Sequence, residues 1–246
     1  MTLLILGGTA EARELAAALD GAGVPVISSL AGRVSRPRLP AGEVRIGGFG
    51  GPAALARWLG EHDVTSVVDA THPFAERISA SAASACAETG VELLRLERPG
   101  WSAGPGDRWH WVDSLDDAAA LVPTLGRRVL LTTGRQGLAA FAAVESAWFL
   151  IRCVDPPEVP LPLHSEVLLD RGPYDLSGEL ELIDAHAIDL VDTKDSGGDH
   201  TSAKLGAARE RGLPVVVVRR PARPAGPTVA TVGEAVAWAA KTAYAG

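Results

Sequence analysis

Short runs of apolar residues alternate along the chain with longer stretches rich in helix-forming residues. The runs predict strands at residues 3–6, 24–27, 44–46, 64–69, 91–95, 109–112, 128–131, 148–154, 188–193 and 215–218. The intervening stretches predict helices at residues 10–19, 53–61, 74–89, 114–122, 177–186, 201–211 and 234–244. Continuous apolar runs are typical of strands buried on both faces, so we expect parallel sheets.

The regular alternation of strands and helices predicts an α/β fold. The opening pattern of strand, glycine turn and helix restarts near residue 128. We therefore expect two Rossmann-like subdomains with parallel sheets, and cofactor and substrate in the cleft between them. The predicted division is a dinucleotide-binding subdomain at residues 1–125 and a substrate subdomain at residues 126–246. The boundary is set to within about ten residues, and elements can cross it.

The first strand leads directly into Gly7, Gly8, Thr9 and Ala10, at the start of a helix. A strand, a glycine turn and a helix N-terminus together aim backbone N–H groups at a phosphate. The turn lacks the full G-x-G-x-x-G fingerprint, so an ordinary tight turn is the alternative.

The end of the second strand carries hydroxyl and basic side chains, where an NAD enzyme would have a carboxylate. Ser28 and Ser29 occupy this place, and Arg33 follows shortly after. In dinucleotide-binding folds this strand end lies beside the adenosine ribose. Because hydroxyls and a guanidinium can hold a phosphate, NADP is favoured over NAD. The alternative is that Arg33 is a solvated loop residue.

A third informative stretch follows the strand at residues 64–69. It consists of Ala70, Thr71, His72, Pro73 and Phe74. Ligands of open α/β sheets bind at the carboxyl ends of strands, and the proline restricts the residue before it to an extended conformation. His72 is therefore a candidate catalytic residue in a ligand-facing loop, with a structural or solvated histidine as the alternative.

The loop after the strand at residues 188–193 combines a lysine, a hydroxyl and two glycines. It contains Lys194, Asp195, Ser196, Gly197 and Gly198, and Lys204 lies one turn inside the next helix. This grouping suits a carboxylate or a phosphate, although it lacks the order of a P-loop and a plain turn is the alternative. A Tyr-x-x-x-Lys pair, an H-E-x-x-H motif and a G-x-S-x-G elbow are all missing from the sequence, which leaves nucleotide-assisted redox chemistry.

Composition narrows the class of protein further. The 246 residues are 47% hydrophobic and 22% charged, with a net charge of −7, which argues against a nucleic-acid-binding protein. Cys86 and Cys153 match no metal or redox spacing, so we expect no metal site. No apolar run is long enough for a membrane helix and the first residues lack a secretion signal, so a cytoplasmic enzyme is expected.

Four stretches resemble the precorrin-6A reductases of cobalamin biosynthesis. They are Gly7-Gly8-Thr9-x-Glu11-Ala12-Arg13, residues 69–75 (Asp-Ala-Thr-His-Pro-Phe-Ala), residues 171–174 (Arg-Gly-Pro-Tyr), and residues 193–198 (Thr-Lys-Asp-Ser-Gly-Gly) with Lys204. The stretches follow the order of the family and span essentially the whole chain. One departure is Asp195, where asparagine is expected to be commoner, and its negative charge weakens the interpretation as an anion site.

The resemblance implies NADPH-dependent reduction of one macrocycle double bond, which converts precorrin-6A to precorrin-6B. A hydride would reach one carbon and a proton its neighbour; His72, Lys194 and water are the candidate proton donors. The residues that the resemblance assigns to the cofactor are Gly7, Gly8, Thr9, Ala10, Ser28, Ser29, Arg33, Ala70, Thr71, His72, Pro73 and Phe74. Those that it assigns to the substrate are Lys194, Asp195, Ser196, Gly197, Gly198 and Lys204.

The implied partner is a small-molecule tetrapyrrole, with product transfer to neighbouring pathway enzymes and no role for nucleic acid or a membrane. Its many acetate and propionate groups give basic side chains a function in an acidic protein. Two alternatives remain: the cobalt-precorrin-6A reductase of the anaerobic route, and a non-catalytic NADP-binding sensor. A sensor would not need the second anion loop at residues 194–198.

Overall fold

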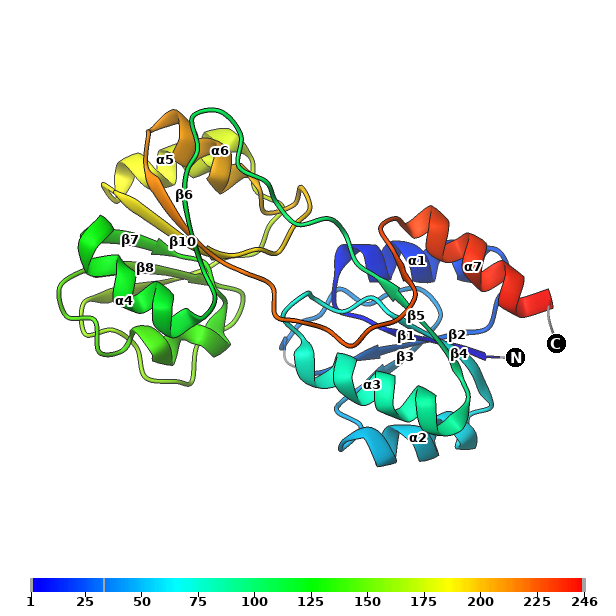
Figure 1. Ribbon diagram of the computed structural model, residues 1–246. Helices are drawn as coiled ribbons and strands as arrows, with labels where there is room; N and C mark the ends of the chain where they lie inside the picture. The colour runs from blue at the N-terminus through cyan, green and yellow to red at the C-terminus, as the bar shows by residue number, and fades with distance from the viewer. Residues whose placement is uncertain (1, 33, 245–246) are drawn as a thin grey trace. The chain divides into compact units, whose positions relative to one another are not determined.

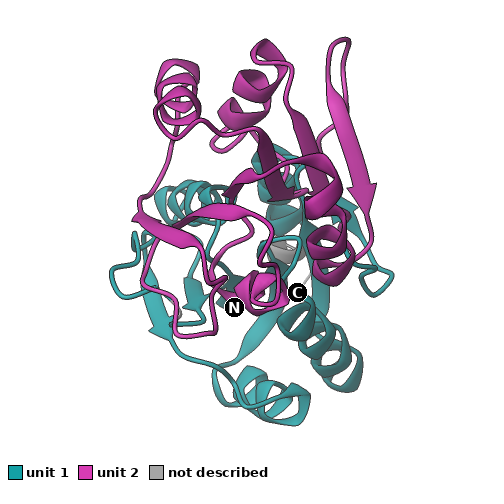
Figure 2. Cartoon of the chain, turned by 90° about the vertical axis from the view of Figure 1, so that its left-hand side faces the viewer, with its two compact units in different colours: residues 1–99, 221–246 teal, residues 100–220 magenta. Residues whose placement is uncertain are grey.

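The computed structural model describes residues 2–32 and 34–244, and it divides the chain into two compact units. Unit 1 contains residues 1–99 and 221–246, and unit 2 contains residues 100–220 (Figure 2). Each unit is built on one six-stranded parallel sheet with helices on both faces (Figure 1). The predicted α/β class and the two Rossmann-like subdomains are therefore confirmed.

The sheet of unit 1 has the strand order β12-β5-β4-β1-β2-β3. Its strands are β1 (Thr2–Leu6), β2 (Val26–Leu30), β3 (Glu43–Ile46), β4 (Val64–Asp69), β5 (Glu92–Leu96) and β12 (Thr228–Val229). β1 lies between β2 and β4, and all four residues Leu3 to Leu6 are buried. The continuous apolar run at the start of the chain thus forms a central strand, covered on both faces.

Among the residues that the structure describes, four helices cover this sheet. They are α1 (Ala10–Gly21), α2 (Pro52–Glu61), α3 (Glu76–Thr89) and α7 (Val232–Tyr244). Leu3 and Ile5 of β1 belong to the core beneath α1 and α7, whereas Leu4 and Leu6 belong to the core beneath α2 and α3 (Figure 1). Alternate residues of one strand therefore face the two helical layers.

The sheet of unit 2 has the strand order β6-β11-β10-β7-β8-β9. Its strands are β6 (Arg108–Val112), β7 (Arg128–Leu131), β8 (Trp148–Cys153), β9 (Ser165–Leu169), β10 (Leu190–Lys194) and β11 (Pro214–Val218). Helices α5 (Leu176–Ala185) and α6 (Ala203–Glu210) cover one face. On the other side, α4 (Leu115–Leu125) contacts β10, β11 and the 3-10 helix η1 (Arg135–Phe141).

The two units divide the chain differently from the expected boundary between residues 125 and 126. The segment at residues 108–125 belongs to unit 2, because β6 pairs along its whole length with β11 and α4 packs against β10 and β11. The last 26 residues return to unit 1 (residues 221–246), where β12 pairs with β5 and α7 packs against α1. An edge strand and a terminal helix have the same local pattern in either sheet, so the sequence does not show which sheet each one joins.

Most predicted elements are present, with three local differences. β2 runs to Leu30, so Ser28 and Ser29 lie inside the strand instead of after it. β9 and β12 were not predicted: β9 is a partly exposed edge strand and β12 has only two residues. The stretch after residue 134 forms a 3-10 helix. Short or half-exposed edge strands lack the apolar run that marks central ones.

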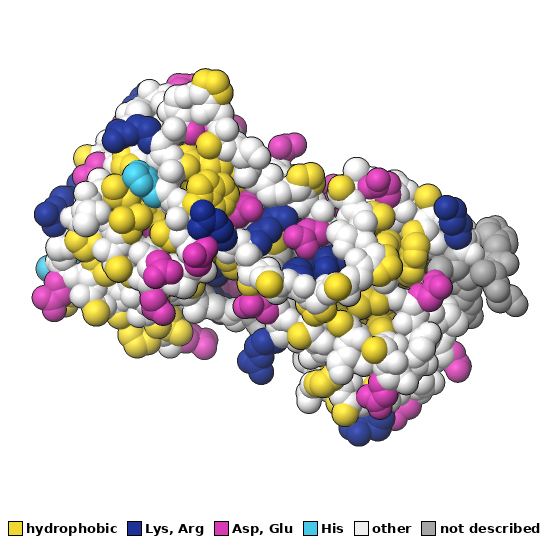
Figure 3. Space-filling view, viewed as in Figure 1, with side chains coloured by type: hydrophobic (Ala, Val, Ile, Leu, Met, Phe, Trp, Pro, Cys, Tyr) yellow, Lys and Arg dark blue, Asp and Glu magenta, His cyan; other side chains and the backbone are white. Residues whose placement is uncertain are grey.

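None of the helices in the described part of the chain is long and apolar enough to cross a bilayer. Within residues 2–32 and 34–244, His, Cys, Asp and Glu form no group of three or more that could hold a metal ion. On the face drawn in Figure 3, acidic and basic side chains are interspersed.

Candidate functional site

Thr9 joins the glycine turn to the end of β4. It is the N-cap of α1, and its Oγ1 accepts a hydrogen bond from the Ala12 N–H at 3.1 Å. The same hydroxyl donates to the backbone oxygen of Ala70 at 2.8 Å. The Gly7 N–H donates to the Ser29 backbone oxygen at 2.9 Å. These bonds hold the ends of β1, β2 and β4 together, so three of the predicted cofactor segments lie side by side.

The glycine turn suits the approach of an anion to the start of α1. Gly8 has φ +116°, a conformation that favours glycine, and a Cβ there would meet nothing within 4 Å. A Cβ on Gly7 would lie 3.4 Å from Leu30 and 3.5 Å from the Ala12 Cβ. Ala10 is the first residue of α1. Glu11 in the first turn is paired with Arg98 at 2.7 Å, which offsets a charge that would repel a phosphate.

Asp69, the last residue of β4, organises the loop that contains the predicted histidine. Its Oδ1 accepts hydrogen bonds from the Thr71 N–H at 3.1 Å and from the Thr71 hydroxyl at 2.6 Å. Its Oδ2 accepts one from the Ser79 hydroxyl in α3 at 2.6 Å. Asp69 and Thr71 are both buried. The carboxylate therefore fixes the chain direction at the point where the strand ends.

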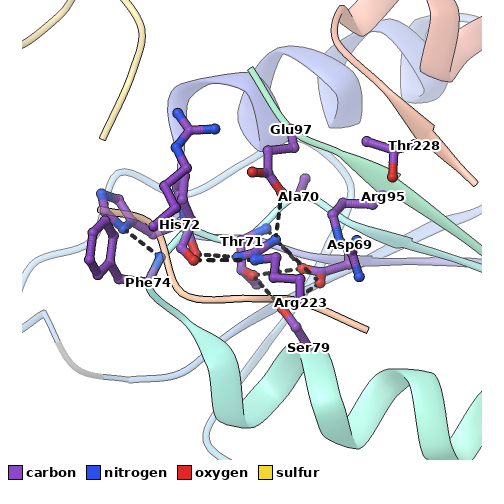
Figure 4. Close-up of polar contacts among 12 residues, drawn as sticks. Asp69, Ala70, Thr71, His72, Phe74, Ser79, Arg95, Glu97, Arg223 and Thr228 are labelled. Atoms are coloured by element: carbon purple, nitrogen blue, oxygen red, sulfur yellow. Dashed lines mark hydrogen bonds and ion pairs between the residues drawn. The ribbon is translucent and has the colours of Figure 1, made fainter. Parts of the chain in front are cut away.

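Arg223 holds the next two residues of that loop from the returning C-terminal segment (Figure 4). Its Nη2 donates to the His72 backbone oxygen at 2.5 Å, and its Nε donates to that of Pro73 at 3.2 Å. Its Nη1 lies 3.4 Å from Glu97 Oε2 and 3.8 Å from Asp69 Oδ2. The Arg223 side chain is 6% exposed, so a buried guanidinium holds the backbone of this loop in place.

The His72 and Phe74 side chains lie next to each other in the same loop (Figure 4). Their ring centroids are 5.8 Å apart, and the Phe74 N–H donates to His72 Nδ1 at 3.3 Å. An accepting Nδ1 places the proton of the neutral ring on Nε2. Both residues are half-buried, in contrast to Ala70, which is buried.

The end of β2 contains two buried hydroxyls and an arginine from the neighbouring strand. Ser28 is 2% exposed and its Oγ has no hydrogen-bond partner among the described residues. Ser29 Oγ accepts from Arg45 Nη1 at 3.2 Å. Arg33 lies outside the described residues. Arg45 was not among the predicted cofactor residues, because the pairing of β2 with β3 is what brings it to Ser29.

In unit 2, Trp101 holds the loop between β10 and α6 through two hydrogen bonds. Its backbone N–H donates to Asp195 Oδ1 at 2.9 Å, and its Nε1 donates to the Gly198 backbone oxygen at 2.9 Å. Arg220 Nε lies 3.2 Å from Asp195 Oδ2. The negative charge of Asp195 is therefore paired, and this carboxylate holds both segments that connect unit 2 to the rest of the chain.

Lys204 is the second residue of α6 and is 3% exposed. Its Nζ donates to the Thr201 backbone oxygen at 2.5 Å and lies 4.7 Å from the Trp101 ring centre. The pKa of Lys204 is lowered to about 7, chiefly by burial and also by the positive charge of Arg152, while Glu179 opposes the shift. Arg152 and Glu179 are also buried and form an ion pair at 2.8 Å.

A second pair of interacting titratable groups lies on β10, a buried aspartate and a half-buried lysine. Asp192 is fully buried, and neither carboxyl oxygen has a hydrogen-bond partner among the described residues. Burial raises the pKa of Asp192 well above its usual range, against the opposing effect of Lys194. Burial lowers the pKa of Lys194, again opposed by its partner. Since residues two apart on a strand share a face, the two side chains project from the same side of the sheet.

The predicted residues thus form two groups, one in each unit. Residues 7–10, 28–29 and 70–74 meet at the carboxyl edge of the first sheet. Residues 194–198 and Lys204 meet around Trp101 at the corresponding edge of the second. Arg45, Arg223 and Trp101 contact these two groups but were not among the predicted residues. Their only sequence signals were a charged or aromatic side chain near a glycine or proline, which is common in loops.

A doubly wound parallel sheet with a glycine turn after its first strand places unit 1 in the Rossmann-like class of α/β domains, in which ligands commonly bind at the carboxyl ends of the strands. A sequence model of the precorrin-6x reductase CbiJ/CobK family matches residues 2–240. The chain belongs to this family, which confirms the family expected from the sequence.

Individual relatives agree with this membership. A precorrin-6A reductase of Rhodococcus erythropolis is 55% identical over 238 residues, 96% of each chain. A solved structure described as CobK precorrin-6A reductase superimposes with a TM-score of 0.93 at 44% identity, and covers 98% of this chain and 97% of its own. A cobalt-precorrin-6A reductase of Salmonella typhimurium is 30% identical over 236 residues, 89% of this chain and 87% of its own.

Proposed function

We propose that this protein is an NADPH-dependent reductase that converts precorrin-6A to precorrin-6B in cobalamin biosynthesis. The observation that carries the proposal is the 55% identity to a precorrin-6A reductase over 96% of both chains. The identity to the cobalt-precorrin enzyme is 30%, so the metal-free substrate is favoured over the cobalt-containing one.

The group at the edge of the first sheet supports NADPH as the cofactor. Its glycine turn, the α1 N-terminus and the absence of a carboxylate from the end of β2 suit a dinucleotide with an extra phosphate. The bound cofactor would supply the hydride. In the proposal, Gly7, Gly8 and Thr9 hold its phosphates, and the loop at residues 70–74 orients its nicotinamide half.

The group in unit 2 supports an anionic substrate. Lys194 and Lys204 would hold carboxylate side groups of the macrocycle, with the N–H groups of Gly197 and Gly198 as further donors. Trp101 and Asp195 would act as positioning residues, since their contacts set the course of the loop. His72 and Lys194 remain the candidate proton donors within the protein, and water is the third candidate.

An anaerobic turnover experiment tests this function. The protein is incubated with NADPH, or with NADH, and with precorrin-6A or cobalt-precorrin-6A, while nicotinamide absorbance and macrocycle mass are followed. The expected result is oxidation of NADPH with precorrin-6A and a product that has gained a hydride and a proton. Faster turnover of the cobalt form would favour the anaerobic alternative, and no oxidation with either macrocycle would refute the reductase.

A further inference from the structure

We infer that Arg45 is the residue that recognises the 2′-phosphate of the cofactor and makes the protein selective for NADPH over NADH. This inference rests on the proposed function and goes beyond it, because it assigns selectivity to a residue of β3 that no sequence motif marks.

The position of Arg45 follows from the register of the sheet. β2 and β3 are parallel neighbours, and Arg45 is paired with Ser29, the residue before the last in β2. Partners in a parallel register project from the same face, and here the two side chains are hydrogen-bonded at 3.2 Å. The guanidinium therefore lies at the strand end where dinucleotide-binding folds place the adenosine ribose.

The Arg45 guanidinium is fixed by hydrogen bonds along one of its edges and by an aromatic ring against one of its faces. Its Nη1 donates to the Gly47 backbone oxygen at 2.6 Å, and its Nη2 donates to that of Gly48 at 2.9 Å. Its Cζ lies 3.7 Å from the centre of the Phe49 ring, which packs edge-on against Trp58 at 5.3 Å. The guanidinium is thus already oriented, and a ligand would not have to fix a mobile side chain.

Part of the guanidinium is left for a ligand. A guanidinium has five N–H donors, and the bonds to Ser29, Gly47 and Gly48 use three of them. Nε and the second hydrogen of Nη2 have no partner among the described residues. Two such neighbouring donors match two oxygens of a phosphate, the bidentate geometry that distinguishes Arg from Lys.

The charge of Arg45 is also uncompensated within the described residues. Its three hydrogen-bond acceptors are neutral, and none of the described ion pairs includes it, although the chain has an excess of acidic residues. Burial lowers the pKa of Arg45 because no carboxylate offsets the desolvation of its charge.

Binding measurements on the full chain test the assignment without turnover. Calorimetry compares NADP⁺ with NAD⁺, and adenosine 2′,5′-bisphosphate with ADP, for the wild type, Arg45→Gln and Arg45→Lys. The matched control is Arg57→Gln, which removes one positive charge from an exposed position of α2. Arg45→Gln is expected to weaken the two 2′-phosphorylated ligands by about 10- to 100-fold, and to leave NAD⁺ and ADP unchanged. The affinity of Arg45→Lys for these two ligands should be intermediate, because lysine keeps the positive charge but cannot form two parallel hydrogen bonds to a phosphate.

The possible outcomes separate this inference from the proposed function. If the wild type prefers NADP⁺ and Arg45→Gln keeps that preference, Arg45 is not the selectivity residue, while the NADPH proposal stands. If Arg45→Gln weakens NAD⁺ and NADP⁺ equally, Arg45 only fastens the loop at residues 47–48, and the inference is overturned. If the wild type binds none of the four ligands, both the inference and the NADPH proposal fail.

Discussion

Arg223 Nη2 donates a hydrogen bond to the backbone oxygen of His72, 151 positions earlier in the chain, at 2.5 Å. The two residues meet because the chain leaves unit 1 after residue 99 and returns to it at residue 221. The loop with the candidate catalytic histidine is therefore held by a segment that folds against it only after unit 2 has been synthesised.

Arg223→Gln is expected to destabilise the protein by about 3 kcal/mol, because it leaves Glu97 and Asp69 without their buried cation. It should also weaken NADPH binding, since the loop at residues 72–73 loses the hydrogen bonds that Arg223 donates to its backbone oxygens. The control is Arg95→Gln, which removes a contact to the same returning segment, through the Pro224 backbone oxygen at 2.9 Å, but none to the loop. Urea unfolding measures the loss of stability in each variant, and NADPH titration should show a larger loss of affinity in Arg223→Gln than in Arg95→Gln. Equal losses of affinity would contradict the role of Arg223 in holding the loop.

Thr9→Val is expected to lower the free energy of unfolding by about 1–2 kcal/mol. The variant loses both the N-cap of α1 and the hydrogen bond to Ala70. Thr9→Ser keeps the hydroxyl and should retain most of the stability. Chemical denaturation of the two variants checks this expectation. A loss in Thr9→Ser as large as in Thr9→Val would show that the methyl group matters and the hydroxyl does not.

Lys204 should make stability depend on pH. Its pKa is about 7 in the folded protein against an ordinary value of 10.5, so between these values the unfolded chain holds the extra proton. This group therefore lowers the free energy of unfolding most below pH 7. As pH rises toward 10, the free energy of unfolding increases by up to about 1.4 kcal/mol per pH unit. Lys204→Met should be more stable than the wild type near pH 6.5, with an advantage that shrinks as pH rises.

Thermal unfolding from pH 6.5 to 9.5 measures that difference. Lys241→Met, at an exposed position of α7, is the control and should follow the wild type at every pH. An advantage of Lys204→Met that stays constant across the range would mean that Lys204 does not change its protonation there.

Asp192 should have the opposite pH signature. Its folded pKa lies well above 3.8, so the folded protein holds a proton that the unfolded chain releases. The stability contributed by this group is fully present below the unfolded pKa and decreases as pH rises. Asp192→Asn keeps the size of the neutral acid and should gain stability over the wild type between pH 4 and 7. Urea midpoints across that range check this, and a gain that does not grow with pH would contradict it.

Lys194→Ala is expected to weaken binding of the macrocycle more than binding of NADPH. The side chain belongs to unit 2, where it ends β10, and the residues assigned to the cofactor belong to unit 1. Separate titrations with precorrin-6A and with NADPH provide the comparison, and Lys241→Ala serves as the charge control. Unchanged affinity for the macrocycle would remove Lys194 from the substrate site.

The sequence by itself was sufficient to predict the fold class and the three loops at strand ends. Continuous apolar runs such as Leu3 to Leu6 are typical of parallel sheets covered on both faces, and the glycines after them favour turns. These are local properties, and local patterns do not depend on which strand lies beside which. The family was also predicted from four short stretches, and the comparisons confirm it.

The tertiary structure decided the features that depend on pairing. The location of β6 in the second sheet and of β12 in the first follows from strand register, and neither strand carries a local mark of its sheet. For the same reason, Arg45 at Ser29, Arg223 at His72 and Trp101 at Asp195 were not predicted. Each contact joins residues distant in sequence. The energy that selects them comes from burial and hydrogen bonding in the assembled units, whereas the sequence pattern reports only the propensity of each segment.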